Sequence, residues 1–212
     1  MCSGRVDLAH VFRAFSKGAD GVFIGSCHLS ECNYITQGNY HALTMVSLAK
    51  KLLEHIGLNP QRLKIEFMSA SDSNVFVESV NSFVNRLREL GPLGQGEGLH
   101  EQDVKFKLDA VTRIIPYVRL VERERLRLPT MPEEGYQKFF AGEELSRLFD
   151  ETVADKLAVA EIVSLLREGP RSTAEIAKTL GLSPSEVSRH LTTSSRQRLV
   201  RYDAGEKRYA LA

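Results

Sequence analysis

The 212-residue sequence has no tryptophan, only three cysteines and no long apolar run. A membrane-spanning helix needs about 20 consecutive apolar residues, so the sequence predicts no membrane partner. The P-loop, the GxGxxG fingerprint and the GxSxG nucleophile elbow are also missing, which removes the common motifs of nucleotide binding and serine hydrolysis. A net charge of +1 indicates no partner by itself.

All three cysteines, Cys2, Cys27 and Cys32, fall within the first 32 residues. Their odd number argues against a set of disulfides, and the chain does not open on the apolar segment of a secretory signal. We therefore expect a cytoplasmic location, where thiols stay reduced. Clustered cysteines in that compartment are typical of metal binding or redox chemistry.

The spacing of the cysteines predicts a shared site. Residues 21–26 form a short apolar run that is typical of a buried strand, and Cys27 follows it directly. Ligands of open α/β sheets collect at the carboxyl ends of the strands. Cys32 lies five residues further on, and Cys2 belongs to a second loop. Three thiolates from two loops would form an incomplete metal cage.

Three kinds of role fit these thiols. They could be small buried apolar side chains, as free cysteines often are. They could bind zinc, with His28 completing a set of four ligands. They could also hold a 2Fe-2S cluster, which needs four ligands and usually takes them all as thiolates.

Several blocks of sequence favour the third role. They are Cys2-Ser3-Gly4-Arg5-Val6-Asp7, Ala14-Phe15, Gly18-Ala19-Asp20-Gly21-Val22, Cys27-His28-x-x-Glu31-Cys32-x-Tyr34-x-x-Gly38-Asn39 and Ser69-Ala70-Ser71. Together they strongly resemble the delta subunit of methyl-viologen-reducing hydrogenase, from Met1 to about Pro92. The resemblance implies a 2Fe-2S electron-transfer subunit of an oxidoreductase complex that is not catalytic alone.

The same resemblance implies residue roles and partners. Cys2, Cys27 and Cys32 take the places of the cluster cysteines of the family, and His28 is a candidate for a hydrogen bond to a cluster sulfur. The implied acceptor is the flavoprotein subunit of a heterodisulfide-reductase-type complex. The implied donor is a hydrogenase or an NAD(P)H dehydrogenase module.

One part of the family pattern is not in this sequence. Family members normally begin with a further strand and helix that carry a Cys-Cys-x-x-Cys motif. We therefore expect another chain or segment to supply the fourth sulfur ligand. A split gene, a start codon assigned too late and an upstream selenocysteine codon read as a stop would each explain the difference.

Hydrophobic periodicity predicts a partial, flavodoxin-like layered α/β domain over residues 1–92. Asp7 is expected to cap a first helix and Asn39 a second. Residues 62–68 alternate polar and apolar side chains, which is typical of an edge strand, and a third helix is expected from Asp72 to Gly91. With the Cys27 strand, the predicted order is helix, strand, helix, strand, helix.

Residues 93–152 are predicted to be a helical linker and docking segment. The glycine-rich stretch 93–98 is typical of a flexible linker. A long helix is expected from Leu99 to about Leu128, with a kink at Pro116. An amphipathic aromatic segment over residues 136–149 is expected to dock against a neighbouring domain.

Residues 153–212 predict a winged helix-turn-helix domain. A helix over residues 153–167 is followed by two Ser-x-x-Glu capping boxes, which begin at Ser172 and Ser183. A β-hairpin is expected over residues 199–211. Three helices and a wing resemble the ArsR-type repressors.

DNA binding is the less favoured role for this domain. Its candidate contacts are Ser185, Ser188, Arg189, Arg196, Arg198, Lys207 and Arg208. Ten basic and seven acidic residues over 153–212 make only a modest charge surplus. We therefore prefer protein docking and keep, as the rival function, a redox-sensing winged-helix transcription regulator in which cluster loss alters DNA contact.

Overall fold

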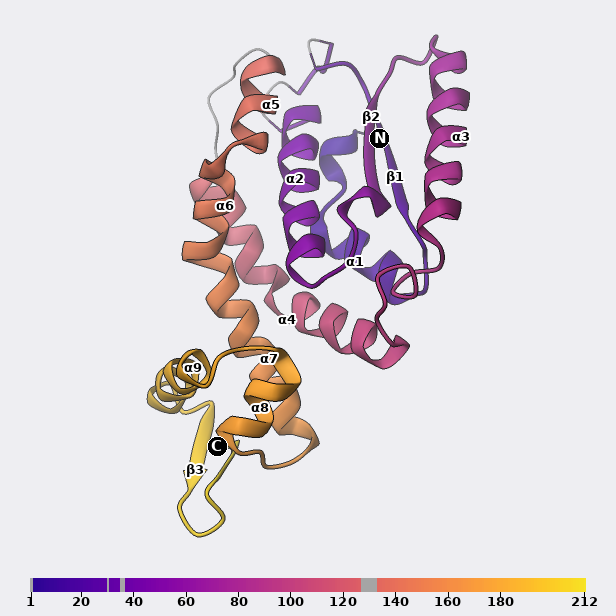
Figure 1. The fold of residues 1–212 in the computed structure, drawn as a ribbon. Helices are drawn as coiled ribbons and strands as arrows, with labels where there is room; N and C mark the ends of the chain where they lie inside the picture. Colours follow the sequence, from indigo (N-terminus) through magenta and orange to yellow (C-terminus); the bar gives the residue numbers. More distant parts are fainter. Residues whose placement is uncertain (1, 30, 35–36, 127–132) are drawn as a thin grey trace. The chain divides into compact units, whose positions relative to one another are not determined.

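The computed structural model describes residues 2–29, 31–34, 37–126 and 133–212. They divide into two compact units, Met1–Phe149 and Asp150–Ala212 (Figure 1). The first unit is mostly helical and contains a small parallel sheet, while the second contains a β-hairpin. In the part of the chain that is described, no helix combines the length and apolar character needed to cross a bilayer.

The sheet of the first unit consists of β1 (Val22–Ser26) and β2 (Leu63–Phe67), which run parallel. Helix α2 (Asn39–His55) connects them and lies on the side of the sheet opposite α3 (Ser73–Leu90) (Figure 1). Helix α1 (Leu8–Ser16) precedes β1 in the sequence, so the predicted order of helices and strands is confirmed. Two described strands are too few to establish the flavodoxin-like layering.

The first two helices begin in different ways. The side chain of Asp7 caps α1 by accepting a hydrogen bond from the Ala9 N–H at 2.7 Å, as predicted. The prediction that Asn39 caps α2 is wrong, because Asn39 is already the first helical residue and Gly38 holds the cap position. The amide of Asn39 has partners elsewhere, which are described below.

The stretch over residues 93–98 is not a flexible linker. It folds into a hydrogen-bonded turn that is held by Arg62, at the end of the short 3-10 helix η2 (Pro60–Arg62). Arg62 is 0% exposed and donates two hydrogen bonds to the carboxylate of Glu97, at 2.6 and 3.0 Å. It also donates to the carbonyls of Asp20 and Gly91, so one buried guanidinium joins the start of β1 to the end of α3.

Three further helices complete the first unit. Helix α4 (Glu101–Arg125) runs through Pro116 as one element, and its predicted end near Leu128 lies outside the described residues. Helices α5 (Glu133–Ala141) and α6 (Glu143–Phe149) form from the aromatic segment. Both contact α2, through Tyr136 against Tyr40 and Phe149 against His55, with ring centroids 4.6 and 5.3 Å apart.

The second unit has the predicted winged helix-turn-helix elements. A π-helical turn η3 (Asp150–Ala154) leads into α7 (Asp155–Glu168), α8 (Thr173–Leu180) and α9 (Pro184–Arg196). The wing consists of the antiparallel strands β3 (Val200–Asp203) and β4 (Arg208–Leu211). Both capping boxes are confirmed, because Ser172 and Ser183 each exchange hydrogen bonds with the glutamate three residues later.

Candidate thiol site

The three cysteines lie where the predicted strand end places them. Strand β1 ends at Ser26, so Cys27 is the first residue beyond its carboxyl end. Cys2 precedes the short 3-10 helix η1 (Ser3–Arg5), and the hydroxyls of Ser3 and Ser26 lie 2.8 Å apart. All three thiols are free; Cys32 is buried and the other two are partly exposed.

Neighbouring thiols shift the pKa values of Cys27 and Cys32. Burial raises the pKa of Cys27, and the hydrogen bond with Cys32 and the charges of Cys32 and Cys2 raise it further. Burial also acts to raise the pKa of Cys32, but backbone hydrogen bonds at Asn39 and Tyr34 and bonds with the other two thiols outweigh it, so that this pKa is lowered. Cys32 is therefore the sulfur that ionises before Cys27.

The donor set suits a thiolate-bound metal in kind, although it supplies only three sulfurs. Iron–sulfur clusters and zinc both take thiolate ligands, normally four in number. Among the described residues, no three or more His, Cys, Asp or Glu side chains form a ready-made metal-binding group. The three thiols thus affect one another's ionisation, but the described side chains around them are not arranged as a preformed metal site.

Two glycines allow the loops of the site to pack closely. A Cβ atom on Gly38 would collide with the sulfur of Cys32. A Cβ atom on Gly4 would collide with the carbonyl oxygen of Gln37. Because any larger residue at these positions would push the loops apart, glycine at 4 and 38 keeps the loops that carry Cys2 and Cys32 in contact.

Asn39 fixes the backbone of the Cys27 loop. Its Nδ2 donates to the carbonyls of Cys27 and His28, at 3.1 and 2.6 Å, and lies 3.7 Å from the sulfur of Cys27. Asn39 is fully buried. The sequence predicts Asn39 to be a helix cap and so does not reveal this loop-binding role. The signal that could have shown it is the position of Gly38-Asn39 at the end of the block of sequence that contains Cys27 and Cys32.

His28 links the ends of the two strands. Its Nε2 lies 3.1 Å from the carboxylate of Asp72, which also accepts a hydrogen bond from the backbone N–H of Ser69 at 2.8 Å. The Ser69 bond and then the His28 bond lower the pKa of Asp72 to about 2. Nε2 of His28 therefore faces a carboxylate. In the sequence, Asp72 is identified only as the start of a helix, so its contact with His28 is not predicted.

A buried acid and an imidazole meet between α2 and α4. Glu122 is 8% exposed, and its Oε1 lies 3.6 Å from Nε2 of His41. Neither this oxygen nor Nδ1 of His41 has a hydrogen-bond partner among the described atoms. Burial raises the pKa of Glu122 to about 7, with Arg119 acting to lower it and Asp7 to raise it. Burial lowers the pKa of His41.

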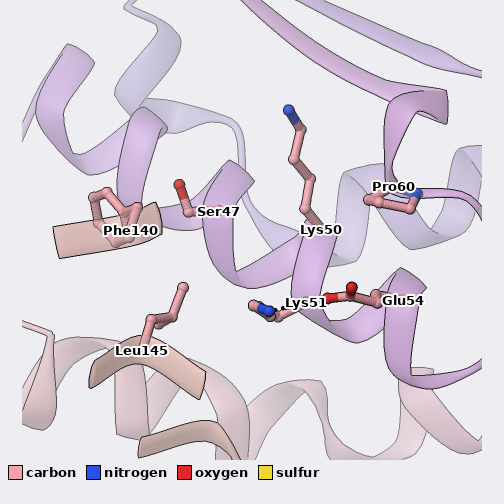
Figure 2. Close-up of a pocket in the computed structure, with 7 residues that line it drawn as sticks. All are labelled: Ser47, Lys50, Lys51, Glu54, Pro60, Phe140 and Leu145. Carbon is pink, nitrogen blue, oxygen red and sulfur yellow. Dashed lines mark hydrogen bonds and ion pairs between the residues drawn. The ribbon is translucent and has the colours of Figure 1, made fainter. Parts of the chain in front are cut away.

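An open hollow of about 220 Å³ lies along α2, next to η2, α5 and α6 (Figure 2). It is lined by Ser47, Lys50, Lys51, Glu54, Pro60, Phe140 and Leu145. Lys51 pairs with Glu54 at 3.0 Å. Burial, and then the neighbouring Lys64, lower the pKa of Lys50. Because no cysteine or histidine lines this hollow, it is separate from the thiol chemistry.

In the second unit, the predicted DNA contacts are exposed, but two of them are engaged with acids. Arg189 donates two hydrogen bonds to Asp155, at 2.8 and 3.0 Å. Arg208 donates to Glu175 at 3.2 Å. The other candidates are Ser185, Ser188, Arg196, Arg198 and Lys207, all exposed. The ion pairs reduce the positive charge that this face offers to phosphate.

Comparison with known proteins bears on both units. Residues 1–91 match the family described as methyl-viologen-reducing hydrogenase, delta subunit. The vhu iron-sulfur subunit of the F420-non-reducing hydrogenase from Methanopyrus kandleri is 42% identical over 92 residues, which are 43% of this chain and 69% of that protein. The chain belongs to the delta-subunit family. Residues 158–202 match the bacterial regulatory protein arsR family, so a delta-subunit segment is joined here to a winged helix.

Two further relatives define how far the likeness extends. The iron-sulfur subunit of the F420-non-reducing hydrogenase from Archaeoglobus profundus is 43% identical over 91 residues, 43% of this chain and 66% of that protein. A subunit of the ferredoxin/F420H2-dependent CoB-CoM heterodisulfide reductase from Methanosarcina acetivorans is 40% identical over 94 residues, 44% of this chain and 12% of that protein. This chain thus spans slightly less than two thirds of the Archaeoglobus protein and about an eighth of the Methanosarcina protein.

Proposed function

We propose that the chain is a non-catalytic electron-transfer subunit whose delta-subunit segment holds an iron–sulfur cluster of the 2Fe-2S type. The ligands would be the thiolates of Cys2, Cys27 and Cys32, together with a fourth ligand from another chain or segment. When bound, such a cluster supplies reversible one-electron transfer. The observation that carries the proposal is the placement of free thiols around the carboxyl end of β1, where Cys27 follows Ser26 and the neighbour of Cys2, Ser3, lies 2.8 Å from the Ser26 hydroxyl.

The protein supplies the surroundings of the cluster. The amide of Asn39 holds the Cys27 carbonyl and points a donor toward the sulfur of Cys27, which favours thiolate. Glycines at positions 4 and 38 keep the loops together. The His28–Asp72 contact ties this loop to the end of β2. Each contact restricts the motion of a ligand-bearing loop.

The partners proposed are a hydrogenase or NAD(P)H dehydrogenase module as donor and the flavoprotein subunit of a heterodisulfide-reductase-type complex as acceptor. Their support is the identity of the relatives, which include hydrogenase iron-sulfur subunits and a heterodisulfide reductase subunit. In that reductase subunit, the similar segment is part of the same chain. A segment joined to a reductase subunit in one protein is a natural candidate to dock on such a subunit in another.

The test is anaerobic production of the chain together with a source of the fourth ligand. Iron and inorganic sulfide should be present in equal amounts, with a charge-transfer band in the visible. Cys32→Ser should lose the band, because a hydroxyl is a poor substitute for thiolate on iron. Glu31→Gln, an exposed change in the same loop, should keep it. Colourless protein with stoichiometric zinc would overturn the proposal.

A second candidate is a redox-sensing transcription regulator, which the arsR-family match of residues 158–202 favours. Two features of α9 weigh against it. Arg189 of α9 is bound by Asp155, and Glu186 places an acid in the first turn of that helix. Neighbouring genes separate the candidates, since reductase subunits beside this gene favour the relay and a divergent promoter favours the regulator.

A further inference from the structure

The hollow along α2 has a polar side, which α2 itself supplies. Its residues are Ser47, Lys50, Lys51 and Glu54. Residues three and four positions apart are neighbours on a helix surface, so this spacing places all of them on one side of α2. The hydroxyl of Ser47 donates to the carbonyl of Leu43 at 2.9 Å. The amine of Lys51 pairs with Glu54 at 3.0 Å, so both of these charges are compensated within the helix.

Lys50 differs from the other polar residues that line the hollow. Its amine extends away from the Lys51–Glu54 pair (Figure 2), and no carboxylate among the described residues pairs with it. The nearby Lys64 of β2 is paired with Glu66 at 3.0 Å. Burial, and then the charge of Lys64, lower the pKa of Lys50. The hollow thus has a partly buried cation that a bound anion would stabilise.

The opposite side of the hollow is apolar. It is formed by Phe140 of α5 and Leu145 of α6, and Pro60 of η2 lies across from them (Figure 2). Phe140 is partly exposed and Leu145 is buried. A molecule in the hollow would therefore contact an apolar wall on one side and the amine of Lys50 on the other.

The hollow lies between the two aromatic contacts that hold α5 and α6 to α2. Tyr40 makes the first contact in the first turn of α2, and His55 makes the second at its last residue. Residues 47–54 lie between them, so a bound molecule would join the same helices. Helices α5 and α6 are outside residues 1–91, which match the delta-subunit family. The hollow therefore combines α2 with helices that the matched segment does not contain.

Its volume and charge limit what the hollow can bind. An apolar cavity of about 150 Å³ binds a benzene ring, so about 220 Å³ has room for a ring or short chain with a small polar group, roughly ten non-hydrogen atoms. One uncompensated lysine matches a single negative charge. A carboxylate carries one charge, whereas a phosphate monoester carries about 1.5 to 2.

We propose that this hollow binds a small monocarboxylate with an apolar body, such as an arylacetate or a short-chain fatty acid. The carboxylate would pair with Lys50, and the apolar body would lie against Phe140 and Leu145. Binding would stabilise the contact of α5 and α6 with α2. The inference is independent of the proposed function, because the described residues that line the hollow include none of the cluster cysteines.

The probe is phenylacetate, added to the full chain, with acetate and phenylacetamide as matched compounds. Acetate has the charge without the apolar body, and phenylacetamide has the body without the charge. Phenylacetate should bind with a Kd of about 1 mM and roughly tenfold more tightly than either compound. Titration followed by amide NMR measures this, and the largest spectral changes should fall at residues 47–54 and 140–145.

Matched variants separate the charge from the space. Lys50→Met should weaken phenylacetate binding roughly tenfold and leave phenylacetamide binding unchanged, because only the charge is lost. Lys105→Met makes the same change in net charge at an exposed position of α4 and should leave both unchanged. Ser47→Leu fills the hollow and should weaken both. Circular dichroism of each variant checks that the fold is retained.

Saturable binding of phenylacetate that maps to the hollow and depends on Lys50 would support the inference. Three results would each overturn it. They are phenylacetate binding no tighter than acetate binding, unchanged phenylacetate binding by Lys50→Met, and spectral changes that map away from α2, α5 and α6.

Discussion

At the scale of single residues, Glu122 should make stability depend on pH. Burial raises the pKa of its carboxyl from 4.5 to about 7, so the folded state binds this proton more tightly than the unfolded state. The stability that results is complete below about pH 4.5 and is lost as the pH rises through about 7. The difference between the pKa values of Glu122 in the folded and unfolded states corresponds to about 3 kcal/mol in the free energy of unfolding.

Glu122→Gln should remove this dependence, because the amide keeps the shape of the side chain and does not ionise. Urea unfolding of the full chain between pH 5 and pH 9 measures it, with the exposed Glu124→Gln as control. The pKa of the neighbouring His41 is lowered, so its contribution to the stability of the fold has the opposite pH dependence and is lost as the pH falls below 6.5. Equal pH profiles for the unchanged chain and Glu122→Gln would contradict the prediction.

Asn39 illustrates what residue types alone leave undecided. An asparagine before an apolar helical run is a good candidate for a cap, and its side chain makes the same kinds of hydrogen bond in a cap as in a loop anchor. The sequence therefore predicts that this side chain binds the backbone, but it assigns the start of α2 as the partner, whereas the side chain binds the carbonyls of Cys27 and His28. The end of β1 directly before Cys27 is predicted correctly, because a short apolar run has a clear boundary.

At the scale of elements, Arg62 should be the most costly single arginine to remove from the first unit. It is buried with Glu97 and with the carbonyls of Asp20 and Gly91. Arg62→Ala would leave the buried carboxylate of Glu97 with two backbone N–H donors but no charged partner, and would remove the donor that several carbonyls share, which costs about 3 to 5 kcal/mol. Urea unfolding measures the loss, and the exposed Arg88→Ala should change the free energy of unfolding by less than about 1 kcal/mol.

This pair also explains why the turn over residues 93–98 was misjudged. The helices of the winged helix were predicted from local signals, such as the capping boxes at Ser172 and Ser183, whose partners lie three residues away. Arg62 and Glu97 are 35 residues apart, and no local pattern connects them. Glycines that were interpreted as flexible instead let the turn reach a buried arginine, as the positive φ of Gly94 indicates.

At the scale of the whole molecule, two units carry two different kinds of chemistry. The three free thiols belong to Met1–Phe149. The predicted DNA contacts belong to Asp150–Ala212. The electron relay proposed for the first unit would gain from a second docking module on the same polypeptide, because linkage raises the effective concentration of the partner. This favours protein assembly as the task of the winged helix.

The last prediction tests that task through the Asp155–Arg189 pair. Because Asp155 binds Arg189 with two hydrogen bonds, the full chain should bind duplex DNA only weakly at physiological salt. Asp155→Asn should free Arg189, strengthen binding at low salt and steepen the logarithmic salt dependence by about one unit, as one more phosphate is contacted. Asp150→Asn makes the same change in net charge and should alter the slope less.

Fluorescence anisotropy with a labelled duplex, including DNA from upstream of the gene, measures binding from low to physiological salt. Apolar docking is little affected by salt, so a protein partner should stay bound over the range in which DNA is released. Sub-micromolar, sequence-selective binding by the unchanged chain at physiological salt, lost on Arg189→Ala, would show that the Asp155 pair opens on DNA. The winged helix would then be a gene regulator, and the redox-sensing function would replace the electron relay.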